Sequence, residues 1–114
     1  MILNIYDKGK VKKTYKTDTF RLMYGTIQQI TKVIDFDKLN FDSKEEMTMS
    51  ILDSINEFMD TIDLILTDIF PEITEEELRR TDVLEIVDVV MEAVFFVRDK
   101  ILGRFKGKGK DSKN

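Results

Sequence analysis

The fold is decided by residues 43–80, SKEEMTMSILDSINEFMDTIDLILTDIFPEITEEELRR. The stretch opens with a capping box at residues 43–46, in which the serine hydroxyl and a glutamate carboxylate satisfy two free backbone donors of a helix start. Apolar residues then recur at helical spacing from Met47 to Ile69. Pro71 ends the pattern, because the residue before a proline is pushed out of helical geometry. The sequence therefore predicts one long central helix of about 27 residues and about 40 Å.

A second capping box at residues 74–77 predicts a short helical turn that ends at Arg80. Asp82 and Glu85 are expected to cap the last helix, which the sequence places at residues 83–102. Apolar residues cover most of the circumference of this last segment. A helix of that kind is buried centrally or shared between chains. We therefore expect a buried C-terminal helix.

Residues 2–16 are expected to form a β-hairpin. β-branched and aromatic residues lie on both sides of residues 7–10, DKGK, whose glycine suits a tight turn. A two-stranded hairpin is marginally stable alone in water. Its apolar face must therefore lie on the helices or on another subunit.

Between the hairpin and the long helix, the sequence predicts a first helix with Asp18 as its N-cap. Gly25 interrupts the apolar pattern of that helix, and we interpret it as a place of close contact with another element rather than as a functional hinge. Residues 35–42 are expected to form a connecting loop whose aromatic side chains pack inward. The apolar residues at helical spacing are Phe20, Met23, Tyr24, Ile27, Ile30 and Ile34.

The fold class predicted for the 114 residues is therefore mainly α, with an N-terminal β-hairpin followed by a small helical domain. One proline and five glycines are too few turn signals for an all-β fold. We expect a single domain over residues 1–103, with Gly103 after the last helix. Residues 104–114 are expected to be a disordered basic Lys/Gly tail.

The chain contains no cysteine and no histidine, which excludes disulfides, Cys/His zinc sites and histidine-based catalytic triads. Asp35, Asp37 and Glu46 resemble part of a calcium-binding loop. Leu39 and Asn40, however, occupy the positions where that loop requires an oxygen ligand and a glycine. A glycine-rich phosphate loop is also missing. The sequence predicts no cofactor, no metal site and no enzyme.

Charge is unevenly distributed along the chain. Residues 1–16 and 103–114 each carry a net charge of +4, whereas residues 17–102 carry −12. An acidic body repels phosphates, so we expect no nucleic-acid partner. No apolar stretch reaches about 18 residues and the N-terminus has no signal-peptide pattern, which predicts a cytoplasmic protein with no membrane segment.

Acidic residues also follow one another at helical spacing on the two main predicted helices. We interpret them as solvated faces, with a docking surface for a basic partner segment as the alternative. They are Asp53, Glu57, Asp60 and Asp63 on the long helix, and Glu85, Asp88, Glu92 and Asp99 on the last helix.

Two stretches resemble the tail assembly chaperones of long-tailed bacteriophages that infect Gram-positive bacteria. They are residues 15–26, YKTDTFRLMYGT, and residues 64–80, LILTDIFPEITEEELRR. The resemblance extends over residues 5–102 and includes the length and the order of elements. It rests on structural signatures, because the chain has no catalytic motif.

The resemblance implies a non-enzymatic phage protein that binds the tape measure protein, keeps that long helical chain soluble and helps to recruit tail tube subunits. Such a protein would act in the host bacterial cytoplasm and be absent from the finished virion. The family often makes a longer product by a programmed ribosomal frameshift. The Lys/Gly tail would suit such a junction.

The physical basis of such binding would be an apolar surface that covers a partner helix. Methionines at positions 47, 49, 59 and 91 would adapt that surface to varied partners, although each also suits a core. We also expect a homo-oligomer, because the last helix is more apolar than a small domain can cover. The partner-binding candidates are Val89, Phe96, Val97 and Met49. A rival hypothesis is a small acidic regulatory module that sequesters a basic host or phage protein.

Overall fold

The structure, a computed structural model, describes residues 1–19 and 21–102. In chain order its elements are β1 (Ile2–Asp7), β2 (Lys10–Lys16), α1 (Tyr24–Val33), α2 (Lys44–Asp53), α3 (Ile55–Ile69), α4 (Glu75–Leu78), α5 (Val83–Phe96) and a π-helical turn, η1 (Val97–Leu102). This confirms the mainly α fold with an N-terminal hairpin. The expectations for Phe20, for Gly103 and for the tail at 104–114 lie outside the described residues.

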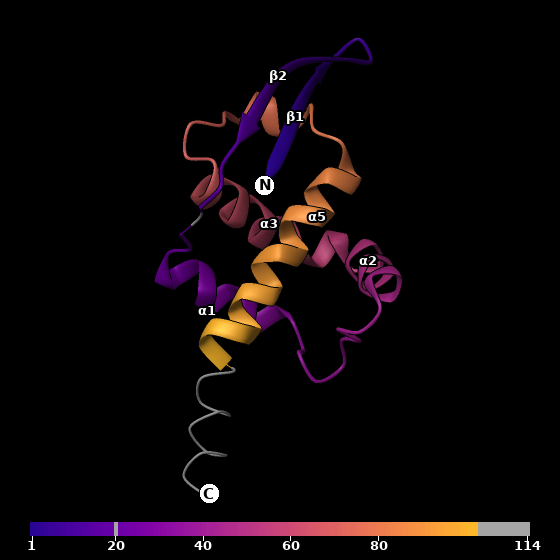
Figure 1. The fold of residues 1–114 in the computed structure, drawn as a ribbon, viewed down its shortest axis with the longest axis vertical. Helices are drawn as coiled ribbons and strands as arrows, with labels where there is room; N and C mark the ends of the chain where they lie inside the picture. Colours follow the sequence, from indigo (N-terminus) through magenta and orange to yellow (C-terminus); the bar gives the residue numbers. More distant parts are fainter. Residues whose placement is uncertain (20, 103–114) are drawn as a thin grey trace, which may run out of the picture.

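α5 runs through the middle of the molecule, with the other helices around it and the hairpin at one end (Figure 1). The helix contacts β1, α2 and α3. Its buried residues are Val87, Val89, Val90, Met91, Ala93 and Val94. The prediction of a buried C-terminal helix is therefore confirmed, and its last turns, residues 97–102, have π-helical rather than α-helical geometry.

The prediction of one long central helix is wrong, because two helices, α2 and α3, meet at Ser54. This residue has φ −108° and ψ 13°, outside helical geometry, and it ends α2 and begins α3. Asp53 and Asn56 lie beside it, and short polar side chains of this kind compete with the helix for backbone hydrogen bonds. The break allows α2 to turn away from α3, so the two helices cover different parts of α5 (Figure 1).

The two predicted capping boxes differ in the structure. At Thr74 the box is complete, since the side chains of Thr74 and Glu77 each accept from the other's backbone N–H. At Ser43 the hydroxyl accepts from the backbone N–H of Glu46 at 3.2 Å. The Glu46 carboxylate accepts instead from the side-chain amide of Asn40 at 2.7 Å, so this is a serine N-cap without the reciprocal bond.

The hairpin turns at Lys8 and Gly9, whose φ angles of 52° and 78° are both positive, as in the tight turns that suit the twist of hairpin strands. The residues flanking the turn, Asp7 and Lys10, are paired, and a bulge shifts the register between Ile5 and Tyr6. Side chains alternate across β1, so Leu3 and Ile5 enter the core. The hairpin therefore packs its apolar face on the helices, as expected.

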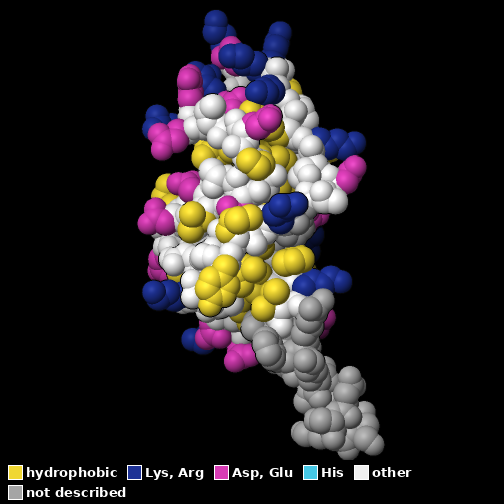
Figure 2. Space-filling view, turned by 90° about the vertical axis from the view of Figure 1, so that its left-hand side faces the viewer, with side chains coloured by type: hydrophobic (Ala, Val, Ile, Leu, Met, Phe, Trp, Pro, Cys, Tyr) yellow, Lys and Arg dark blue, Asp and Glu magenta, His cyan; other side chains and the backbone are white. Residues whose placement is uncertain are grey.

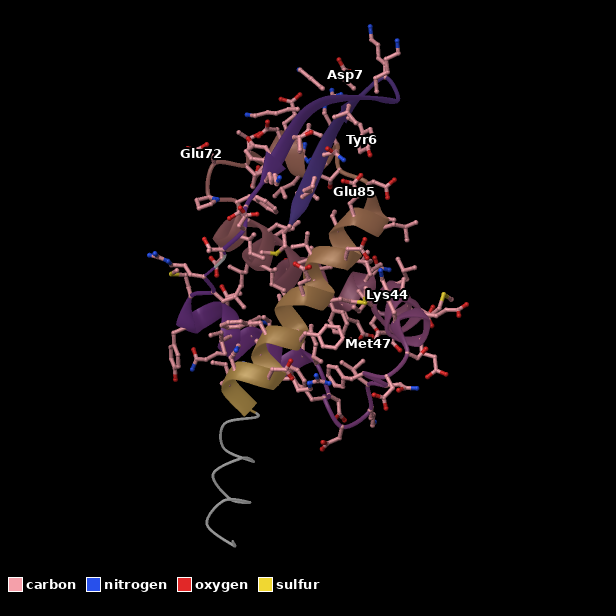
Figure 3. All side chains as sticks on the ribbon, in the orientation of Figure 1. Tyr6, Asp7, Lys44, Met47, Glu72 and Glu85 are labelled. Carbon is pink, nitrogen blue, oxygen red and sulfur yellow. The ribbon has the colours of Figure 1, made fainter. Side chains whose placement is uncertain are left out.

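The edge of β1 that does not pair with β2 is hydrogen-bonded to residues at and just before the start of α5. The Glu85 carboxylate accepts hydrogen bonds from the Asn4 backbone N–H at 2.9 Å and the Tyr6 hydroxyl at 2.5 Å. Tyr6 and Glu85 lie close together between β1 and α5 in Figure 3. The Tyr6 backbone N–H also donates to the Arg80 carbonyl at 2.8 Å. Glu85, expected to cap the last helix, instead holds the hairpin, while the Asp82 side chain caps α5 as predicted.

α1 begins at Tyr24, so Asp18 is not its N-cap. The start of α1 is held by another helix instead, because the Met23 backbone N–H donates to the Asp68 carboxylate of α3 at 2.9 Å. The interpretation of Gly25 as a close contact is also wrong, because a Cβ atom at this position would meet nothing within 4 Å.

The loop between α1 and α2 packs its aromatic rings inward, as expected. Phe36 and Phe41 stack with ring centroids 6.2 Å apart, and Phe41 meets Phe95 of α5 edge to face at 5.5 Å. The Arg98 guanidinium lies over the Phe41 ring at 4.3 Å. This loop therefore anchors the far end of α5.

Candidate partner-binding groove

Several large apolar side chains remain exposed on the folded chain. Apolar side chains gather on the lower half of the face shown in Figure 2, whereas lysines and arginines gather at the hairpin end. The exposed large apolar residues are Ile2, Val11, Met23, Tyr24, Met49, Met59, Leu64, Val83 and Leu84. Two of them, Met59 and Val83, line the same cavity.

This cavity, which we call the α3–α5 groove, has a volume of about 410 Å³. Its α3 wall carries four apolar residues at the helical spacing i, i+4, i+7 and i+11, a length of about 16 Å or three helical turns. The opposite wall comes from α4 and the start of α5. The lining residues are Ile55, Met59, Ile62, Asp63, Leu66, Glu75, Leu78, Arg79, Thr81, Val83 and Ile86.

Charged groups lie among the apolar walls of the α3–α5 groove. Asp63 and Glu75 bring two carboxylates, and Arg79 brings one guanidinium. Partial burial raises the pKa of Asp63, and the neighbouring charges of Asp60 and Glu75 raise it further. The groove thus combines an apolar floor with an excess of negative charge at its edge.

The methionines expected to adapt to partners fall into two classes. Met47 and Met91 are buried in the core, and Met47 lies between α2 and α5 in Figure 3. Met49 and Met59 are 54% and 57% exposed. Met59 alone among these four lines the α3–α5 groove.

The four predicted partner-binding residues do not come together in the structure. Val89 and Val97 are in the core, 2% and 0% exposed, so neither offers surface to a partner of this folded chain. Phe96 is half-buried against the core, and Met49 is exposed on α2. The surface of α5 is better covered than expected because α2 and α3, separated at Ser54, pack on it as two helices.

The α3–α5 groove could not be identified from the sequence, because its walls come from three separate elements, α3, α4 and α5, that meet only in the folded chain. One signal pointed to it. The acidic stripe that includes Asp60 and Asp63 allowed a docking surface for a basic segment as an alternative, and Asp63 lines the groove.

Glu77 is the group with the most strongly perturbed titration. Hydrogen bonds from the Tyr15 hydroxyl at 2.7 Å and the Thr74 backbone N–H at 3.0 Å, together with the Lys13 ammonium at 3.4 Å, lower its pKa to about 2. Lys13 and Tyr15 belong to β2, so the carboxylate joins the hairpin to α4. This arrangement is structural.

Within residues 1–19 and 21–102, no three acidic side chains gather into a group that could hold a metal ion. Over the same residues, no helix is both long enough and apolar enough to cross a membrane. Comparison of the chain with known protein families, with curated proteins and with solved structures finds no match.

Proposed function

We propose that this protein is a non-enzymatic tail assembly chaperone of a long-tailed bacteriophage, which binds the tape measure protein and keeps it soluble until the tail is built. The observation that supports it best is the α3–α5 groove, an apolar cavity along about three turns of α3 with Met59 and Val83 exposed in its lining. A long helical chain has apolar seams that need cover before assembly, and a groove of this kind suits a helix. The resemblance of residues 15–26 and 64–80 to this family supports the same function.

In this proposal the protein acts in the host bacterial cytoplasm, helps to recruit the major tail tube protein and does not remain in the virion. A frameshifted longer product would extend the chain beyond its Lys/Gly tail.

Co-expression with the tape measure protein tests the proposal. We expect the soluble fraction of the tape measure protein to rise and the two chains to co-purify. Met59→Asp should abolish the rise in soluble tape measure protein if the α3–α5 groove is the binding site. Met49→Asp, the control, changes an equally exposed methionine outside the groove and should leave that rise intact. An unchanged soluble fraction with the unaltered chain would remove the central support for the proposal.

The acidic body, with −12 over residues 17–102, favours a second candidate, a regulatory module that sequesters a basic protein. The neighbouring genes discriminate between the two. A major tail protein gene upstream and a very long coiled-coil gene downstream support the chaperone, whereas genes for immunity or transcription support the regulatory module.

A further inference from the structure

We infer that the occupant of the α3–α5 groove is an amphipathic helix of about three turns, whose apolar seam is flanked by lysine or arginine residues. The inference rests on the proposed function in one respect, since it takes the groove to be the surface that binds a helical partner. It adds the chemistry of that partner.

The shape of the groove argues for a helix. Ile55, Met59, Ile62 and Leu66 repeat along one face of α3 with the periodicity of a helix packing surface. Ile62 and Leu66 are buried and form the floor of the groove, whereas Met59 is exposed at its edge. Val83, at the start of α5, is 44% exposed and lines the groove with them. Exposed apolar residues that face one another across a groove are covered most completely by an apolar seam inserted between them.

The charges of the groove argue for basic flanks. Asp63 and Glu75 lie in the lining and Asp60 is near enough to Asp63 to act on it, against the single guanidinium of Arg79. Carboxylates that lie close enough to repel one another are costly to the folded chain. A cation brought by a partner would relieve that cost, and acidic flanks would increase it.

Substitution of Asp63 can distinguish attraction of a basic partner from a purely structural function. Because burial and like charges disfavour its ionised form, Asp63→Asn should raise the stability of the free chain at neutral pH. The same substitution should weaken the binding of a basic helix. A residue that only supports the fold would not show these opposite effects.

Binding can be measured with three labelled synthetic peptides of about two heptads each, by fluorescence anisotropy with the full chain. The first has a leucine seam flanked by lysines, the second the same seam flanked by glutamates, and the third the composition of the first in scrambled order. We expect the first to bind at least about tenfold more tightly than either of the others. Its affinity should fall in about 1 M salt, where the Debye length is about 3 Å.

Variants then assign the site. Met59→Asp should weaken binding of the first peptide by about tenfold, and the pair Asp63→Asn and Glu75→Gln by about threefold or more. Glu92→Gln, a carboxylate on α5 outside the groove lining, is the matched control and should leave the affinity unchanged.

Equal binding of the lysine and glutamate peptides, or binding that Met59→Asp leaves intact, would overturn the inference. So would a dimer of the chain that Met59→Asp dissociates, because the occupant would then be a second copy. If the tape measure protein is made soluble but the lysine peptide does not bind, this inference fails and the chaperone stands. If the lysine peptide binds in the groove but the tape measure protein stays insoluble, the chaperone fails instead.

Discussion

Glu77 connects the hairpin to α4 through one carboxylate. It accepts from Tyr15 of β2 and from the Thr74 backbone at the start of α4, and it lies 3.4 Å from the Lys13 ammonium. Each of these partners favours the ionised form. The charged form of this carboxylate therefore stabilises the contact between the hairpin and α4.

We expect Glu77→Gln to lower the free energy of unfolding at neutral pH. The pKa of Glu77 in the folded chain, about 2, is below the usual 4.5, so its stabilising effect is fully present above pH 4.5 and is lost as the pH falls toward 2. The difference between the variant and the unaltered chain should shrink over that interval in urea unfolding. Glu92→Gln is the control, and a constant difference across the interval would contradict the assignment.

Two glycines should respond to alanine in opposite directions. Gly25 lies in the first turn of α1 with open space around it, so Gly25→Ala should stabilise the chain by about 0.5 kcal/mol. Gly9 has φ 78°, where an L side chain is strained, so Gly9→Ala should cost about 1 kcal/mol. Thermal unfolding of both variants checks this. Destabilisation by Gly25→Ala would indicate a contact at that glycine.

At the scale of the element, α3 presents one buried and one exposed face. Ile65 is fully buried, whereas its neighbour Leu64 is 41% exposed. We expect Ile65→Ala to cost about 3 kcal/mol. Leu64→Ala should cost less than about 1 kcal/mol, because surface positions seldom exceed that. Chemical denaturation measures the free energy of unfolding of both variants. Equal losses would contradict the orientation of α3 in which Ile65 faces the core and Leu64 faces outward.

The elements that local chemistry determines could be predicted from the sequence. The Thr74 box, the stop before Pro71, the Asp82 cap and the turn at Gly9 each depend on residues within a few positions of one another. The break at Ser54 could not, because the apolar stripe continues through it and short polar residues like Asp53 and Asn56 also occur inside unbroken helices, as Asp60 and Thr61 do in α3.

The structural contacts of Glu85 and Asp68 could not be predicted either, because they join segments that are distant in the sequence. Both bind backbone N–H groups of segments far away in the sequence, Asn4 for Glu85 and Met23 for Asp68. For the candidate site, the sequence indicated an apolar, methionine-containing surface and acidic helix faces. It did not indicate that Met59 and Asp63 meet Val83 across a groove.

At the scale of the whole molecule, the exposed apolar residues bear on the predicted homo-oligomer. We still expect self-association, now through the start of α1, where Tyr24 is 76% exposed, rather than through Val89 and Val97. Sedimentation velocity should show an oligomer that Tyr24→Lys weakens and that Met59→Asp leaves intact. Removal of residues 104–114 should leave it intact, because charged residues contribute little buried apolar area.

A clean monomer at high concentration would contradict this expectation. Phe96 is a poor choice for the experiment, because it packs against the core and its replacement would also disturb folding.

The central position of α5 has a consequence for how the chain is made. The first strand is completed by Glu85 and Thr81, and the core of α1, α2 and α3 closes on a helix near the end of the sequence. A ribosome adds about 5–20 residues per second, from the N-terminus onward. The hairpin and the first three helices are therefore synthesised before their packing partner, and they cannot bury their apolar faces on it until α5 follows. During those seconds a chain proposed to shield another protein has exposed surfaces of its own, and it becomes able to shield a client only after α5 has been made and has packed.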